Sequence, residues 1–202
     1  EGPMNVLVAN ANNFVGTGAT NNQGIDIDAT SSDLADLMTL QVVGQNNFTI
    51  AGTNSEGIQV QTEGPSNILI QNNNDQGIVM AGADSFGLRF LDLSANSNVQ
   101  INNNIINMSG IGSDAIYFDL IDATSSSVVI DANTLSIFDG DIFEVESAVS
   151  FNAMTNGPLQ LGTGINNVVN VTSVGNNGTF ILFNPGGGTF DGQISLNNFL
   201  LP

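Results

Sequence analysis

Short segments in which apolar and polar residues alternate recur along this chain at nearly regular intervals. One series is a small residue followed by apolar-x-apolar. Its copies are GIDI (24–27), GIQV (57–60), GLRF (87–90), AIYF (115–118) and, with the small residue replaced, IFEV (142–145). These copies begin 33, 30, 28 and 27 residues apart. Alternation with a period of two residues is typical of a strand with one buried face, and a fixed longer interval indicates a repeat architecture.

Two further series share this interval. The second reads NILI (67–70), NVQI (98–101), SVVI (127–130) and AVSF (148–151). The third consists of inward-facing pairs: Phe48/Ile50, Ile78/Met80, Ile106/Met108, Leu135/Ile137 and Leu159/Leu161. Gly, Asn, Asp and Ser separate the segments, and these residues are favoured in turns.

Three short strands per repeat, each stacked on its equivalent in the next repeat, predict an all-β parallel β-helix (a solenoid) of about seven coils. A β-sandwich is the main alternative, but it does not require matching strands at a fixed long interval. We expect a single domain over residues 1–202. Its coils should be regular over 4–161 and less regular over 162–202, where Gly186 to Gly188 predict a bulging loop.

Asparagine is concentrated at one point of the repeat. The chain has 30 asparagines, and several follow a second-series strand directly: Asn10, Asn72 to Asn74, Asn102 to Asn104, Asn133 and Asn152. Asparagine tolerates the left-handed backbone of a tight bend, and its amide can both donate and accept a hydrogen bond. We therefore predict a corner lined by stacked asparagines, whose role is structural.

Charge narrows the range of partners. Nineteen acidic residues face one basic residue, Arg89, and the chain has no lysine, histidine or cysteine, which gives a formal charge of −18. Such a surface repels nucleic-acid phosphates and anionic membranes, and no apolar run is long enough to span a bilayer. We expect neither a nucleic-acid partner nor membrane insertion. The lack of cysteine excludes a disulfide framework and thiolate metal sites.

The stretches SNVQINNNIINMSGIGSDAIYFD (97–119) and SSVVIDANTLSIFDGDIFEVE (126–146) resemble repeats of right-handed parallel β-helix proteins. They are similar in particular to segments of bacterial autotransporter passengers and surface adhesins. The resemblance implies a right-handed helix at the bacterial cell surface or outside the cell, with a structural or adhesive role. A glycan or a surface protein would be the partner, or the open coil ends would associate into fibres. Related coils also occur in polysaccharide-active enzymes, so the fold does not settle the function.

The outer face of the first series holds the candidate site. Outward positions form two rows: Asp26, Gln59, Arg89, Tyr117 and Glu144, and then Asp28, Gln61, Leu91, Asp119 and Glu146. Equivalent side chains of adjacent coils should lie about 4.8 Å apart. The group Asp119, Glu144 and Glu146 is therefore the best acidic cluster, and Asp26 with Asp28 is a second. Clustered carboxylates can stay solvated, bind calcium, or act as an acid–base pair.

We favour a solvated acidic face, with calcium as the only cofactor considered. The alternative is an acid-only glycoside hydrolase that uses Asp119, Glu144 and Glu146. Serine or cysteine chemistry would lack its usual histidine base. Tyr117 is the aromatic side chain placed most clearly outward, and with Arg89 it is the candidate for ligand binding.

Overall fold

The computed structural model describes residues 3–29, 37–91, 93, 96–118, 127–131, 133–137, 143–146, 159–161, 170–173, 181–184 and 192–194. Strands and turns make up this part of the chain, and it contains no helix. The all-β prediction is therefore confirmed.

The strands form three parallel sheets. The first sheet is β1 (Asn5–Ala9), β4 (Met38–Val43), β7 (Ser66–Gln71), β10 (Asn98–Asn102), β13 (Ser127–Asp131), β16 (Leu159–Leu161) and β19 (Gly192–Ile194). The second sheet is β2 (Asn13–Gly16), β5 (Asn47–Ile50), β8 (Ile78–Met80), β11 (Ile105–Met108), β14 (Thr134–Ile137) and β17 (Asn170–Ser173). The third sheet is β3 (Gln23–Ala29), β6 (Glu56–Thr62), β9 (Phe86–Leu91), β12 (Asp114–Phe118), β15 (Phe143–Glu146) and β18 (Ile181–Asn184).

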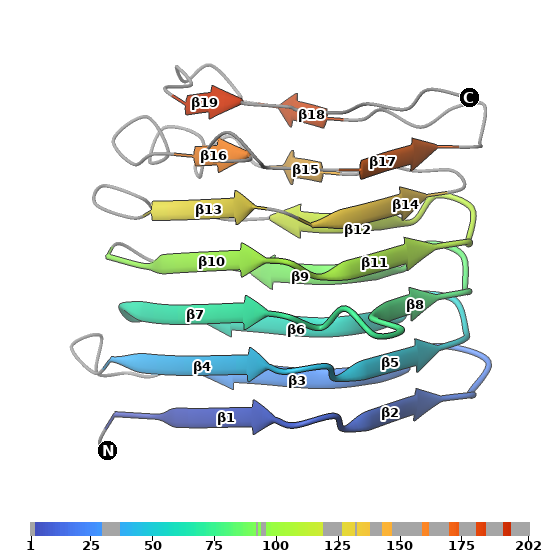
Figure 1. Ribbon diagram of the computed structural model, residues 1–202, viewed down its shortest axis with the longest axis horizontal. Helices are drawn as coiled ribbons and strands as arrows, with labels where there is room; N and C mark the ends of the chain where they lie inside the picture. Colours follow the sequence, from blue (N-terminus) through green and yellow to red (C-terminus); the bar gives the residue numbers. More distant parts are fainter. Residues whose placement is uncertain are drawn as a thin grey trace.

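Each of the first six coils contributes one strand to each sheet and then rises to the next coil. In Figure 1 the near strands run left to right, the far strands run right to left, and the chain climbs from β1 to β19, which is right-handed winding. The first sheet has seven strands, but about four turns are described together with their side chains, fewer than the seven coils expected. The predicted parallel β-helix is confirmed.

The core is built by side chains stacked coil upon coil along the axis. Ile58 and Val60 of β6 pair with Leu88 and Phe90 of β9, and all four are at most 1% exposed. Aromatic rings stack in the same way, with 4.6 Å between the ring centroids of Phe90 and Phe118. Burying one such side chain stabilises the fold by about 1.5–3 kcal/mol. No coil can do this alone, because its neighbours provide the apolar surface.

An asparagine ladder lines the corner between the first and second sheets. The Nδ2 of each member donates to the Oδ1 of the next, over 2.8 Å from Asn12 to Asn46 and 2.9 Å at each later step to Asn73, Asn104 and Asn133. The backbone N–H of each donor residue bonds to the same oxygen. The remaining amide hydrogen of Asn73 reaches the carbonyl of Val42 at 3.0 Å, one coil back. The ladder therefore satisfies polar groups that are almost completely buried from Asn46 to Asn133.

The asparagine-lined corner is thus confirmed, although its members differ in part from those expected. Asn73, Asn104 and Asn133 belong to it, and Asn12 and Asn46 were missed. Asn10, Asn72 and Asn103 instead adopt left-handed φ angles of 70°, 59° and 52° and make the bend just before the ladder. Asn152 lies outside the described residues, as does the predicted loop at Gly186 to Gly188.

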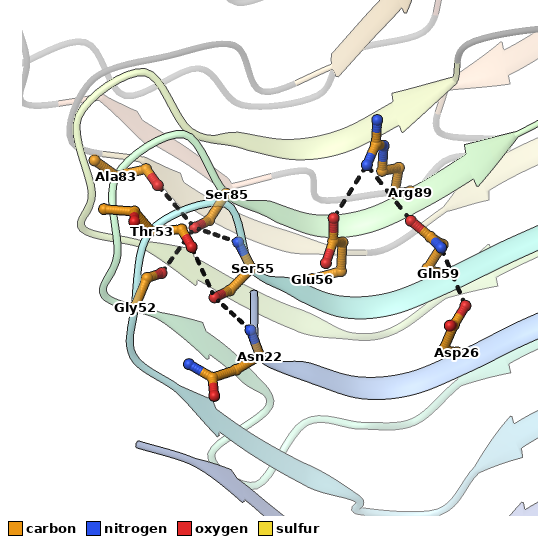
Figure 2. Close-up of polar contacts among 10 residues, drawn as sticks. All are labelled: Asn22, Asp26, Gly52, Thr53, Ser55, Glu56, Gln59, Ala83, Ser85 and Arg89. Atoms are coloured by element: carbon orange, nitrogen blue, oxygen red, sulfur yellow. Dashed lines mark hydrogen bonds and ion pairs between the residues drawn. The ribbon is translucent and has the colours of Figure 1, made fainter. Parts of the chain in front are cut away.

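A second ladder, not expected from the sequence, lies at the corner before the third sheet. The backbone N–H groups of Asn22, Ser55 and Ser85 donate to the Oγ of Ser55, Ser85 and Ser113, over 3.0, 3.1 and 3.1 Å. A left-handed residue precedes each member here too: Asn21, Asn54, Asp84 and Gly112. Figure 2 shows the run from Asn22 to Ser85. Both corners therefore combine a left-handed bend with a buried hydrogen-bonding side chain.

One assignment near the end of the regular repeat was wrong. Leu159/Leu161 was expected in the third series, which forms the second sheet, but β16 pairs with β13 in the first sheet. The strand of the second sheet in that coil is β17. AVSF (148–151), which was expected in the first sheet, lies outside the described residues. The chain between β15 and β16 is longer than the turn at that corner in earlier coils, and this shifts the sequence interval on which the assignment relied.

The ladder can be tested by replacing one buried amide with its isosteric acid. Asn73→Asp can still accept from Asn46, but it loses the bonds donated to Asn104 and Val42. It also buries a charge. We expect the free energy of unfolding in denaturant to fall by about 3 kcal/mol or more.

Asn72→Asp is the matched control. It adds the same charge next door at an exposed position, where it can still accept the bond from Asn103 Nδ2. Its effect should stay within about 0.5 kcal/mol. Equal losses in the two variants would contradict a structural role for the ladder.

Close backbone approach at the corners gives a second test. A Cβ added at Gly82 would overlap the carbonyl oxygen of Gly52 in the coil below. Gly82→Ala should therefore lower the free energy of unfolding by at least about 3 kcal/mol. Gly44 is the comparison, because its φ is 84° and the nearest atom to an added Cβ is 3.6 Å away. Gly44→Asn should leave the denaturation midpoint nearly unchanged, since asparagine already makes this bend in other coils.

Candidate functional site

The outer face of the third sheet carries the predicted row of functional side chains in register. Asp26 pairs with Gln59, Gln59 with Arg89, Arg89 with Tyr117, and Tyr117 with Glu144. Alternation along each strand turns Ile25, Ile27 and their equivalents inward, so Asp26, Gln59, Arg89 and Tyr117 point outward. The pairing places one residue from each of five successive strands in a single row, which runs from Asp26 on β3 to Glu144 on β15.

Arg89 joins two neighbouring coils through its guanidinium. Nη1 lies 3.0 Å from Oε1 of Glu56 and 3.5 Å from Oε1 of Gln59, both on β6. Gln59 continues the chain of contacts, since its Nε2 donates to Oδ1 of Asp26 on β3 over 3.0 Å. Figure 2 shows these side chains lying along the outside of the sheet. Three successive coils are therefore linked by one polar chain.

Two aromatic rings lie beside the same guanidinium. The Cζ of Arg89 lies 4.6 Å from the ring centroid of Phe86 and 5.8 Å from that of Tyr117. The two rings are 4.7 Å apart and tilted by 49°. Arg89 Nε is buried and makes no hydrogen bond within the described part of the chain, and the ring of Phe86 gives the cation a partial substitute for water.

The burial of this group decides what it can bind. Tyr117 points outward but is only 7% exposed, and the side chain of Arg89 is 28% exposed. A ring covered to this degree cannot offer its face to a sugar, and the charge of Arg89 is opposed by Glu56. The ligand-binding role of Tyr117 and Arg89 stays a prediction. This geometry favours a structural role, in which the two side chains help to hold adjacent coils together.

Glu56 is the titratable group that this environment perturbs. Its side chain is 9% exposed. Burial raises the pKa of the Glu56 carboxyl above its usual range. The charge of Asp26 adds to that rise, whereas the charge and the hydrogen bond of Arg89 oppose it. Glu56 therefore holds a proton more tightly in the folded protein than in the unfolded chain.

The predicted acidic cluster is described only in part. Glu144 and Glu146 lie two residues apart on β15 and pair with Leu182 and Asn184 of β18. Asp119 lies outside the described residues, so its adjacency to Glu146 does too. The catalytic and calcium-binding roles of these three residues stay predictions.

Asp26 and Asp28 are exposed on β3 and lie on the same face. Asp28 pairs with Gln61, which pairs with Leu91, as the second row predicts. No group of three or more potential metal-ligating side chains comes together among the residues that the structure describes. The calcium-binding role of Asp26 and Asp28 stays a prediction.

Sequence reasoning missed Glu56 and Phe86 as members of the Arg89 group. They occupy one further row, in which Glu56 pairs with Phe86 and Phe86 with Asp114. The signal was present, because this row immediately precedes the small residue of each first-series copy. Both predicted rows lie after the first apolar residue of each copy, so neither row includes the residue before the glycine.

No helix within the described ranges is long and apolar enough to cross a membrane. No protein-family model, no curated protein and no solved structure matches this chain.

The raised pKa of Glu56 predicts how stability depends on pH. The stabilisation linked to its proton is complete below the ordinary carboxyl pKa of 4.5 and is lost as pH rises through the raised value. In Glu56→Gln this loss disappears. The difference in free energy of unfolding between Glu56→Gln and the parent should therefore rise in favour of the variant from about pH 4 to pH 7.

Glu63→Gln removes an exposed charge and measures the general relief of repulsion in a chain of charge −18. That contribution is subtracted from the Glu56 profile. A remaining difference that is flat across the pH range, or that runs in the opposite direction, would contradict the assignment.

Proposed function

We propose that this chain is a non-catalytic, structural and adhesive β-helix segment of an extracellular bacterial surface protein. It acts as a stiff rod that holds its faces and loops away from the cell. Its partner is a glycan or another surface protein. Association of coil ends into fibres is a variant of the same role, and sedimentation of the purified chain at increasing concentration tests it.

The observation that carries this proposal is the continuity of its internal hydrogen bonding. The asparagine ladder runs without a break through five successive members. The serine ladder runs along the corner at the other end of the second sheet. Each coil is also bonded to its neighbours along three parallel sheets. Such a structure resists bending and local opening, because displacing one coil breaks bonds at both corners.

The charge distribution of the chain favours a binding or structural role over catalysis. Arg89, the single basic side chain of the sequence, is bonded to Glu56 and covered by aromatic rings. The chain has no histidine to serve as a general base. An acid-only glycoside hydrolase based on Asp119, Glu144 and Glu146 is the competing function that the experiment must exclude.

The test separates binding from cleavage in one assay. The purified chain is incubated with neutral and acidic polysaccharides, with and without calcium, and bound protein and released oligosaccharides are measured together. We expect retention on a glycan and no released fragments. Released fragments that disappear in the triple variant Asp119→Asn/Glu144→Gln/Glu146→Gln would overturn the proposal in favour of a hydrolase.

The triple variant should also unfold at the same or a slightly higher denaturant concentration, because it relieves repulsion among like charges. The matched control is Glu63→Gln/Asp75→Asn/Asp84→Asn. It removes three exposed acids from turns of the described coils. A loss of retention in the triple variant alone would assign binding to its acidic face.

A further inference from the structure

The charged residues of the strands are confined to one of the three sheets through the first four coils. Among the third-sheet strands, β3 carries Asp26 and Asp28, β6 carries Glu56, β9 carries Arg89 and β12 carries Asp114. The first-sheet strands β1, β4, β7 and β10 contain no charged residue. The same is true of β2, β5, β8 and β11 in the second sheet. For a chain of charge −18, two neutral sheets are a strong segregation.

The outer face of the first sheet is regular as well as neutral. In the coils whose side chains the structure describes, its central row follows the strand pairing and alternates leucine with glutamine: Leu7, Gln41, Leu69 and Gln100. The row beside it carries short polar side chains: Asn5, Thr39, Asn67 and Asn98. We call these two rows the neutral face. Asp131 lies outside them, on the far edge of the sheet beside Asn102.

The neutral face is available to a partner in the described coils. Leu7 is 66% exposed, and Gln41 and Asn67 are also exposed. Leu69 and Gln100 are half-buried by their neighbours in the same row. The face therefore offers apolar patches and amide groups in alternation, repeating every two coils, or about 9.6 Å.

We propose that the neutral face is the glycan-binding surface of this chain, and that its ligand is an uncharged, extended β-linked polysaccharide lying along the solenoid axis. The inference rests on the adhesive function proposed above and specifies its site and ligand class. An acidic polysaccharide is repelled by the overall charge of the molecule, and a charged partner finds no counter-charge on this face.

The chemistry of such a polysaccharide matches the alternation of the row. Successive rings of an extended β-linked chain turn over, so one side of the chain repeats every second sugar, and its rings follow one another at a spacing close to that of the strands. Glutamine amides donate to and accept from sugar hydroxyls, and leucine lies against the C–H surface of the ring. Each contact is weak, and a long straight polymer gains strength by making the same contact at successive coils.

The experiment measures retention of the whole chain on microcrystalline cellulose and on chitin, with pectate as the acidic comparison. We expect retention on at least one neutral polymer, no retention on pectate, and no change between low salt and 1 M NaCl or on addition of a calcium chelator. Gln100→Glu places a carboxylate in the contact, where its desolvation should weaken retention at least about tenfold.

Gln61→Glu is the matched control, because it makes the same substitution at a half-buried outward position of β6 on the third sheet. It should leave retention unchanged. Circular dichroism and denaturant unfolding of both variants show whether each is folded, so that a loss of binding is not confused with a loss of structure.

Two results would place binding on the acidic face: retention that depends on calcium, or retention that falls in Gln61→Glu but is unchanged in Gln100→Glu. Either result would overturn this inference while leaving the adhesive function intact. If Gln100→Glu instead changes the sedimentation coefficient of the free chain, the occupant of the face is a second copy, and the inference fails. Failure to bind any polysaccharide, neutral or acidic, would overturn both the inference and the glycan-binding part of the proposed function.

Discussion

The coils whose corners the structure describes depend on hydrogen bonds that these corners make to the coil above or below. A chain that bends sharply inside a stack turns backbone N–H and C=O groups away from water, and each unpaired group would cost about 1–3 kcal/mol. At the first corner, one asparagine in each described coil supplies hydrogen-bonding partners for these backbone groups. In Asn73, for example, the amide oxygen accepts from Asn46 while the nitrogen donates both to Asn104 and to the carbonyl of Val42. Serine does the same at the second corner by accepting from the backbone of the preceding coil.

The ladders also set the distance between coils, and other features follow from that distance. Strands stack at the spacing of a parallel sheet, about 4.8 Å, so a corner in van der Waals contact with its neighbour leaves no room for a Cβ at Gly82. Because the coils stack in register, equivalent side chains of successive coils form a row. A row of like charges is unfavourable, which accounts for the mixture of Asp26, Gln59, Arg89 and Tyr117 on the third sheet.

The Arg89 group has the residue types of a binding site, but its polar and aromatic groups already contact one another. One cation, one buried carboxylate and two rings satisfy one another across β6, β9 and β12. By contrast, the first sheet presents a broad, uncharged outer surface in the described coils. The proposed adhesive role would use such an extended surface, where repetition replaces the convergence of groups that a catalytic pocket requires.

The sequence by itself determined most strands of the middle coils, their inward residues and the register of the third sheet from β3 to β15, because alternation and a repeat of about thirty residues are local signals that survive without a structure. It also indicated the asparagine corner, but it could not separate the ladder residue Asn73 from the bend residue Asn72, since both are asparagine and only the backbone φ distinguishes them. The pairing of Arg89 with Glu56, the burial of Tyr117 and the serine ladder were decided by the tertiary structure alone. Each depends on which atoms of separate coils come within hydrogen-bonding or van der Waals distance, and a linear pattern carries no information about distances between coils.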